Sequence, residues 1–190
     1  PASSATNLNS GTINIHGNLI MNLLNTGTTT TSGFAIGIAS NNVDTNTVFN
    51  IYNNKISNVF SNGSTTARAV GIGLYMSTVP NVVVNMYNNM VSNLRAPRAT
   101  SNPSVRGIDL QNAGGNGRFN VYNNSSYLNN DVPPTIAAHY STNMYWANFG
   151  TGTLDLRNNI LVNTMASQTG KSVNLYPSAN SNYLRLDSTT

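Results

Sequence analysis

The sequence predicts an all-β protein folded as a solenoid, namely a parallel β-helix of about five coils with three short strands in each. Three observations predict this fold class. The segment "FNIYNNKISNVF" at 49–60 returns in altered form at an interval of 35 residues, apolar and polar residues alternate inside each copy, and the 190 residues include no glutamate, a strong helix former. Repeats of this length cannot bury their own apolar faces, so they must stack on their neighbours.

The copies begin at a nearly constant interval. Their first apolar residues lie 36, 35, 35 and 35 positions apart, at Ile13, Phe49, Val84, Phe119 and Leu154. In each copy a polar residue and a second apolar residue follow, which is the period-2 pattern of a strand with one buried face. We expect a single β-helix domain or segment over 1–190, in which 1–12 lead in, five coils start at these residues and 166–190 complete the last coil.

An asparagine pair follows each first strand, except in the first copy, where the pair is Gly-Asn. Asn and Gly tolerate left-handed backbone angles, so each coil is expected to turn a corner here. We predict that the second residues of the pairs form a structural ladder, in which each side-chain amide donates to the next asparagine at a net gain of about 1 kcal/mol per bond. These residues are Asn18, Asn54, Asn89, Asn124 and Asn159.

Two further strands are expected in each coil. A second apolar stretch closes on another possible turn at Asn22, Asn58, Asn93 and Asn163. After a variable polar segment, a third strand is expected in "FAIGIAS", "AVGIGLY" and "VRGIDLQ". A leucine-rich repeat has a shorter period, and a propeller blade has four strands and about 40–50 residues, so a parallel β-helix fits the pattern best.

A column of larger side chains precedes the corner. These side chains should point outward, one above another, at His16, Tyr52, Tyr87, Tyr122 and Arg157. We interpret them as packing between neighbouring strands, which favours aromatic pairs. The alternative is a ligand-contacting platform, on which the three tyrosines stack against a carbohydrate.

The composition excludes several function classes. Only 7% of the residues are charged, and the basic residues behind the net charge of +4 are scattered, so we expect no nucleic-acid partner. No apolar run approaches the roughly 20 residues that span a bilayer, so we expect no membrane insertion. There is no cysteine, and neither His16 nor His139 has a partner at metal-ligand spacing, so we assign no metal and no cofactor.

Catalytic chemistry is hard to place on this sequence. Glycoside hydrolysis needs two carboxyl groups about 5–10 Å apart, and the five aspartates fall in different parts of their coils, at Asp44, Asp109, Asp131, Asp155 and Asp187. Asp109 is the best candidate, because it should face outward in its strand three residues after Arg106. An exposed surface ion pair is the simpler interpretation of these two residues. We therefore assign no catalytic residue.

Other polar and aromatic residues leave alternatives open. Five arginines are either solvated loop residues or a patch that binds acidic glycans: Arg68, Arg95, Arg98, Arg106 and Arg118. Trp146, the single tryptophan, is expected to pack in the core or a loop, with a sugar platform as the alternative.

Several segments resemble the right-handed parallel β-helix repeats of very large secreted or cell-surface proteins of the phylum Bacteroidota. They are "NIYNNKISNV", "NMYNNMVSNL", "VYNNSSYLNN", "VRGIDL" and the closing run "LRNNILVNT…GKSVNLY…NSNYLRL", and the resemblance covers the chain from about residue 13 to its end. It implies a right-handed helix, export by the type IX secretion route and an extracellular location. The "DST" at 187–189 resembles an O-glycosylation acceptor of that phylum.

From these observations we expect a non-enzymatic structural or adhesive module at the cell surface. Neither terminus has an amphipathic helix or charged strand that would cover a sheet edge. We therefore expect the chain to be part of a longer protein or to stack end to end with copies of itself, with glycans as further partners. The alternatives are a polysaccharide lyase or glycoside hydrolase with a groove near Asp109 and Arg106, and a non-catalytic carbohydrate-binding β-helix that uses Tyr87.

Overall fold

The structure is a computed structural model of the chain, and its description covers nine ranges. They are 11–27, 33–41, 45–63, 65–76, 81–100, 103–129, 140–166, 170–178 and 184–186. Within these ranges the chain forms sixteen strands and no helix. The described part of the chain therefore has no helix that could cross a membrane.

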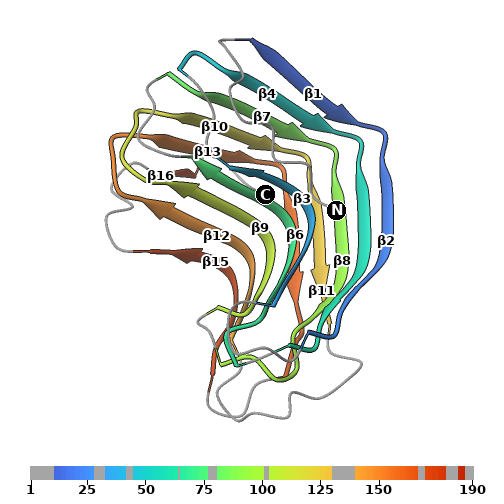
Figure 1. The fold of residues 1–190 in the computed structure, drawn as a ribbon. Helices are drawn as coiled ribbons and strands as arrows, with labels where there is room; N and C mark the ends of the chain where they lie inside the picture. The colour runs from blue at the N-terminus through green and yellow to red at the C-terminus, as the bar shows by residue number, and fades with distance from the viewer. Residues whose placement is uncertain are drawn as a thin grey trace.

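The strands form three sheets, one for each strand position in the coil (Figure 1). Sheet A contains β1 (Thr12–His16), β4 (Val48–Tyr52), β7 (Val83–Tyr87), β10 (Arg118–Tyr122), β13 (Thr153–Arg157) and β16 (Leu184–Leu186). Sheet B contains β2 (Leu19–Asn25), β5 (Lys55–Ser61), β8 (Met90–Arg95), β11 (Ser125–Leu128) and β14 (Ile160–Asn163). Sheet C contains β3 (Phe34–Asn41), β6 (Arg68–Met76), β9 (Val105–Asn112), β12 (Ser141–Asn148) and β15 (Ser172–Pro177).

Every strand pairs in parallel with its equivalent in the next coil. In sheet A the partners are in strict register, so that the five repeat starts from Ile13 to Leu154 lie in one row across β1, β4, β7, β10 and β13. Four turns of about 35 residues separate β1 from β13. The predicted all-β parallel solenoid with three strands per coil is therefore confirmed.

The asparagine pairs turn the first corner of each coil. The first residue of every pair has a left-handed backbone, with φ between 52° and 66° at Gly17, Asn53, Asn88, Asn123 and Asn158. This is the conformation that Asn and Gly accept at low cost.

The second predicted turn is a bend inside a strand. Asn22, Asn58 and Asn93 also have left-handed φ angles, but they lie within β2, β5 and β8. Asn163 ends β14 and is not among the described residues with positive φ; there the chain leaves the strand with the Met165 backbone N–H donating to Asn163 Oδ1 at 3.2 Å.

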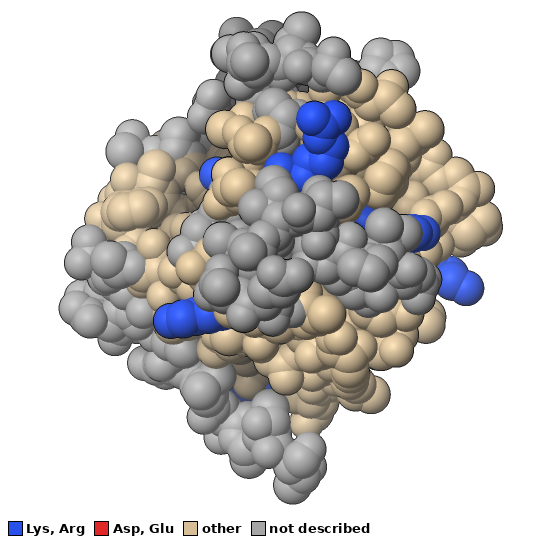
Figure 2. All heavy atoms as spheres, turned by 90° about the horizontal axis from the view of Figure 1, so that it is seen from below, with Lys and Arg blue, Asp and Glu red and all other residues tan. Residues whose placement is uncertain are grey.

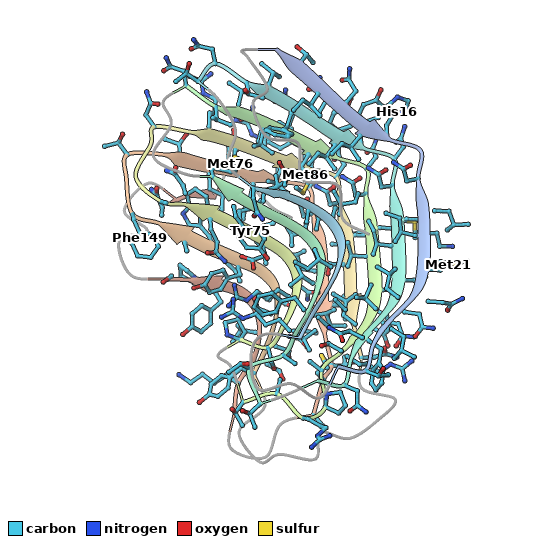
Figure 3. All side chains as sticks on the ribbon, in the orientation of Figure 1. His16, Met21, Tyr75, Met76, Met86 and Phe149 are labelled. Carbon is cyan, nitrogen blue, oxygen red and sulfur yellow. The ribbon has the colours of Figure 1, made fainter. Side chains whose placement is uncertain are left out.

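One apolar core fills the space between the sheets. Phe49 and Ile51 enter it from β4, Ile56 from β5 and Ile72 from β6, each at most 1% exposed. Met86 in β7 is the equivalent of Ile51 one coil further, and Figure 3 shows it inside the stack. Burial of side chains of this size stabilises the fold by about 1.5–3 kcal/mol each.

Trp146 belongs to this core. Its side chain is fully buried, and its ring meets that of Phe119 edge-on, with centroids 5.0 Å apart and planes at 68°. The core interpretation of this residue is confirmed and the sugar platform is wrong. The indole N–H has no hydrogen-bond partner in this apolar surrounding.

Three glycines allow sheet C to approach sheet B closely. A Cβ on Gly71 would lie under 3.0 Å from the Val91 side chain and from the carbonyl oxygen of Gly107. Gly37 and Gly107 hold the equivalent places in β3 and β9 and are equally crowded. These glycines are therefore required by space rather than by a left-handed backbone.

We predict that Gly71→Ala destabilises the protein by about 1–3 kcal/mol, because overpacking forces neighbouring side chains or backbone to move. Gly17→Asn is the matched control. Gly17 has no atom within 4 Å of an added Cβ, its φ is 66°, and the other coils carry Asn there, so its effect should stay within about 1 kcal/mol. Urea unfolding measures both variants, and an unchanged stability of Gly71→Ala would contradict the predicted crowding.

Candidate functional site

The predicted structural ladder is continuous through five coils. The side-chain amide of each asparagine donates to Oδ1 of the asparagine one coil further, at 2.9, 2.9, 2.9 and 3.0 Å from Asn18 to Asn159. We call this column the inner ladder; it consists of Asn18, Asn54, Asn89, Asn124 and Asn159. Asn54, Asn89 and Asn124 are 1% exposed, so their amides depend on protein partners.

The inner ladder also binds the backbone at the corner. The backbone N–H of each of the first four residues donates to the same Oδ1 that accepts its side chain, at 2.9–3.1 Å. From Asn54 onward, each side-chain amide donates in addition to a carbonyl oxygen of the preceding coil, at 2.7–3.0 Å. One side chain per coil therefore joins three successive coils.

A second ladder runs on the outside of sheet A. Its amides donate in the opposite sense, each to the asparagine one coil earlier, at 2.9, 3.0 and 2.8 Å. This outer ladder consists of Asn14, Asn50, Asn85 and Asn120. In the next coil an aspartate, Asp155, takes the equivalent position, which ends the amide column.

The first three rings of the column before the corner stack on one another, as the interpretation of packing between neighbouring strands expected. Tyr52 lies between His16 and Tyr87, with ring centroids 4.7 and 4.9 Å apart and planes within 9°. Both faces of the Tyr52 ring are thus covered, and a sugar ring has no face of Tyr52 to stack on.

The column changes at Tyr122. Its hydroxyl donates to Asp155 at 2.8 Å, and the Arg157 guanidinium lies 5.5 Å from its ring centroid. Arg157 in turn donates to both carboxylate oxygens of Asp155, at 3.0 and 2.8 Å. Burial, followed by the hydrogen bond to Asp155, raises the pKa of Tyr122.

The best candidate carboxylate, Asp109, lies in a polar cluster on the outside of sheet C. Its Oδ2 accepts from Arg106 Nη1 at 2.7 Å and from the Tyr75 hydroxyl at 3.1 Å, and Gln111 Nε2 donates to its two oxygens at 3.0 and 3.2 Å. The Arg106 guanidinium stacks on Tyr145, 3.8 Å from the ring centroid. We call these five residues the Asp109 cluster; Figure 3 labels Tyr75 within it.

The prediction that Arg106 and Asp109 form an exposed surface ion pair is wrong, because both side chains are buried. The side chains of Arg106 and Asp109 are 2% and 0% exposed. Neighbouring side chains cover this outward-facing pair, among them the Tyr145 ring that lies against the guanidinium. Removal of one partner from a buried pair costs about 3–5 kcal/mol, because the other charge is left uncompensated.

The surroundings of the Asp109 cluster shift the pKa values of two groups, Tyr75 and Arg68. Burial, together with the negative charge of Asp109, raises the pKa of Tyr75. Burial and the positive charge of Arg106 lower the pKa of Arg68, whose guanidinium lies 5.3 Å from the Phe34 ring. The Nε atom of Arg68 is buried without a hydrogen-bond partner.

The arginine patch, which was the alternative to solvated loop residues, does not assemble. Arg68 and Arg106 are neighbours on sheet C, Arg95 ends β8 in sheet B, Arg118 begins β10 in sheet A, and Arg98 is exposed in the turn after β8. Figure 2 shows basic side chains at separate places on one face of the molecule. The alternative of one convergent anion site for all five is therefore wrong.

The described part of the chain brings no two aspartates together. Of the five aspartates, the structure describes Asp109 and Asp155, which lie on different sheets; Asp44, Asp131 and Asp187, like His139 and the "DST" segment, lie outside the described residues. A general acid or base must reach its substrate, yet Asp109 has no exposed surface. Among the described residues, no group of three His, Cys, Asp or Glu could hold a metal ion.

The partners of Asp109 could not be read from the repeat pattern alone. Gly73, Asp109 and Tyr145 occupy one row of sheet C, and Gln111 lies one coil after Tyr75. The coil interval, applied to the third strand, predicts that these residues lie on neighbouring strands, but it does not predict their contacts. The hydrogen bonds still depend on how the side chains bend over the small Gly73.

The chain was compared with protein-family models, with curated proteins and with solved structures, and none of them matched. Its classification as a parallel β-solenoid therefore depends on the strand order and register. A fold of this kind is compatible with structural and with carbohydrate-related roles, and the fold alone does not select between them.

We predict that Asn89→Ala lowers the free energy of unfolding by about 3 kcal/mol or more. The change removes five hydrogen bonds of a buried side chain, among them the Oδ1 acceptor that both the backbone N–H and the side-chain amide of Asn54 use, and each buried group left unsatisfied costs about 1–3 kcal/mol. Asn85→Ala in the part-exposed outer ladder should cost about 1 kcal/mol. Urea unfolding measures both, and equal losses would show that the inner ladder has no special role.

We also predict a loss of stability at alkaline pH that depends on Tyr75. The pKa of Tyr75 is raised above the value of about 10 in the unfolded chain, so its contribution is complete below pH 10. Above that pH the unfolded state releases a proton that the native state retains, and stability falls by up to about 1.4 kcal/mol per pH unit. Tyr75→Phe should flatten this fall, whereas Tyr127→Phe, at an exposed tyrosine, should not. Identical pH profiles for both variants would contradict the assignment.

Proposed function

We propose that this β-solenoid is a non-catalytic structural and adhesive module that works outside the cell, within a large surface protein of the kind that its repeats resemble. The observation that carries the proposal is the inner ladder, which links five coils through buried amides without a break. A ladder of this kind stabilises the stack itself rather than a reaction centre.

The geometry suits a rigid spacer. Each coil contacts its neighbours through three parallel sheets, and each inner-ladder asparagine joins three coils. Parallel strands lie about 4.8 Å apart, so five coils form a block roughly 24 Å long. Stacked copies, or further coils of a longer chain, would extend the block into a rod and present its outer faces to glycans or to other proteins.

Composition and resemblance favour an extracellular site for this module. The polar surface depends on asparagine, serine and threonine rather than on charge. The repeats resemble those of secreted Bacteroidota proteins that follow the type IX route. We take this resemblance as support for export and for a role at the cell surface.

The rival function is a polysaccharide lyase or hydrolase that acts through Asp109 and Arg106. The engaged and buried state of Asp109 disfavours it, because three donors already satisfy the carboxylate. A non-catalytic carbohydrate-binding role fits within the proposed function, and the coverage of both faces of Tyr52 leaves this ring no face for stacking on a sugar.

We expect the purified chain to release no reducing ends and no unsaturated products from acidic or neutral polysaccharides. Asp109→Ala should leave that result unchanged while it lowers the free energy of unfolding by about 3–5 kcal/mol, because Arg106 loses its partner. Arg157→Ala, at a half-exposed pair, should cost at most about 1 kcal/mol and serves as the matched control. Turnover by the unmodified chain that Asp109→Ala abolishes would overturn the proposal in favour of an enzyme.

A further inference from the structure

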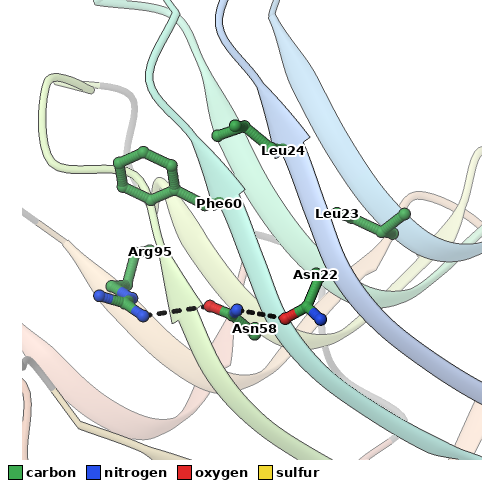
Figure 4. A pocket seen from close by; sticks show the side chains of 6 residues that line it. All are labelled: Asn22, Leu23, Leu24, Asn58, Phe60 and Arg95. Carbon is green, nitrogen blue, oxygen red and sulfur yellow. Dashed lines mark hydrogen bonds between the residues drawn. The ribbon is translucent and has the colours of Figure 1, made fainter.

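A hollow of about 390 Å³ lies on the outside of sheet B, across three neighbouring strands (Figure 4). It is lined by Asn22, Leu23, Leu24, Asn58, Phe60 and Arg95. These residues come from β2, β5 and β8, so the coil register brings them together. The volume falls in the range of about 300–1,000 Å³ that is typical of sites for small ligands.

The polar side of the hollow is a row of hydrogen bonds that all point one way. Arg95 Nη2 donates to Asn58 Oδ1 at 3.1 Å, and Asn58 Nδ2 donates to Asn22 Oδ1 at 2.6 Å. The row thus uses the carbonyl oxygens of both asparagines as acceptors. Donors remain at its two ends, namely the amide nitrogen of the exposed Asn22 and the guanidinium of Arg95, whose Nε is buried without a partner.

The apolar side of the hollow is formed by Leu24 and Phe60. Leu24 is 64% exposed, and the Arg95 guanidinium lies 5.9 Å from the centroid of the Phe60 ring. Further apolar side chains are exposed on the same face, including Leu19, Met90 and Ile160. Figure 3 shows Met21 pointing away from the stack on this side. Exposed apolar surface of this extent marks interaction sites in soluble proteins.

The charge of this face favours an anion. Lys55 and Arg95 lie on the outside of sheet B, whereas the two described acidic residues, Asp109 and Asp155, lie on sheets C and A. A carboxylate that enters the hollow therefore meets cationic and neutral donors and no negative charge from the described residues. The best-matched ligand has acceptor groups on one edge and an apolar face on the other.

We propose that this hollow binds a uronic-acid residue of an acidic polysaccharide, with the carboxylate at Arg95, a ring oxygen or hydroxyl at Asn22, and the C–H face of the sugar against Leu24 and Phe60. The hollow is open, so the acyl chain of a lipid would remain largely in water, whereas a sugar ring is itself polar on its outer edges. The assignment rests on the proposed adhesive function and names its ligand class.

The test measures binding of the full chain to three uronate polymers, namely polygalacturonate, alginate and hyaluronan, and to the carboxyl-reduced form of each. We expect binding to at least one polymer, and about tenfold or greater weakening when its carboxyl groups are reduced. Arg95→Ala should weaken binding by about 10–100-fold, as expected for loss of a charge-assisted contact. Arg98→Ala, at an exposed arginine three residues away and outside the hollow, should change it less than threefold.

Asn22→Asp is the second variant, because it replaces the terminal donor by a negative charge at a left-handed position that aspartate tolerates. It should weaken binding by about tenfold without loss of fold, which circular dichroism monitors. Failure of all three polymers to bind would overturn the assignment, as would equal losses in Arg95→Ala and Arg98→Ala. Arg95-dependent binding to anionic phospholipid vesicles in place of the polymers would do the same. Turnover of a bound polymer would instead overturn the proposed non-catalytic function and leave the binding site intact.

Discussion

Each coil returns to the same corner after 35 or 36 residues, and the rest of the structure depends on this constraint. The side-chain oxygen of each buried asparagine at that corner takes its donors from the coil before, so every inner-ladder asparagine must meet its equivalent in the next coil. The same interval keeps the apolar side chains of three sheets in register inside one core. A change in coil length would break both sets of contacts together.

The three sheets differ on their outer faces although they share this core. Sheet A carries the outer ladder and the stacked aromatic rings, so its polar groups satisfy one another. Sheet C carries the Asp109 cluster, in which a buried ion pair is covered by neighbouring side chains. Sheet B exposes apolar side chains beside two cations. The core does not constrain the outward-facing positions, so their residue types differ between the sheets. The three faces of the solenoid therefore have different surfaces.

Much of the fold was predictable because periodicity reports on contacts between equivalent residues. The repeat starts, the left-handed corner and the pairing of inner-ladder asparagines between coils follow from the interval and from the properties of asparagine. The bend at Asn58 was less predictable, since an asparagine with left-handed φ can end a strand or kink it. The choice between the two depends on pairing with Asn22 and Asn93 in neighbouring coils.

The candidate sites were less predictable than the fold. Asp109 was expected at an exposed surface, yet Tyr75 and Tyr145 from the adjacent coils lie against it and against Arg106. The sequence by itself determined the solenoid, its period and its amide ladder, because these depend on residues that repeat. Only the tertiary structure decided which non-repeating side chains meet, since the burial of Asp109 and the hollow beside Arg95 depend on side-chain directions across strands that are distant in the chain.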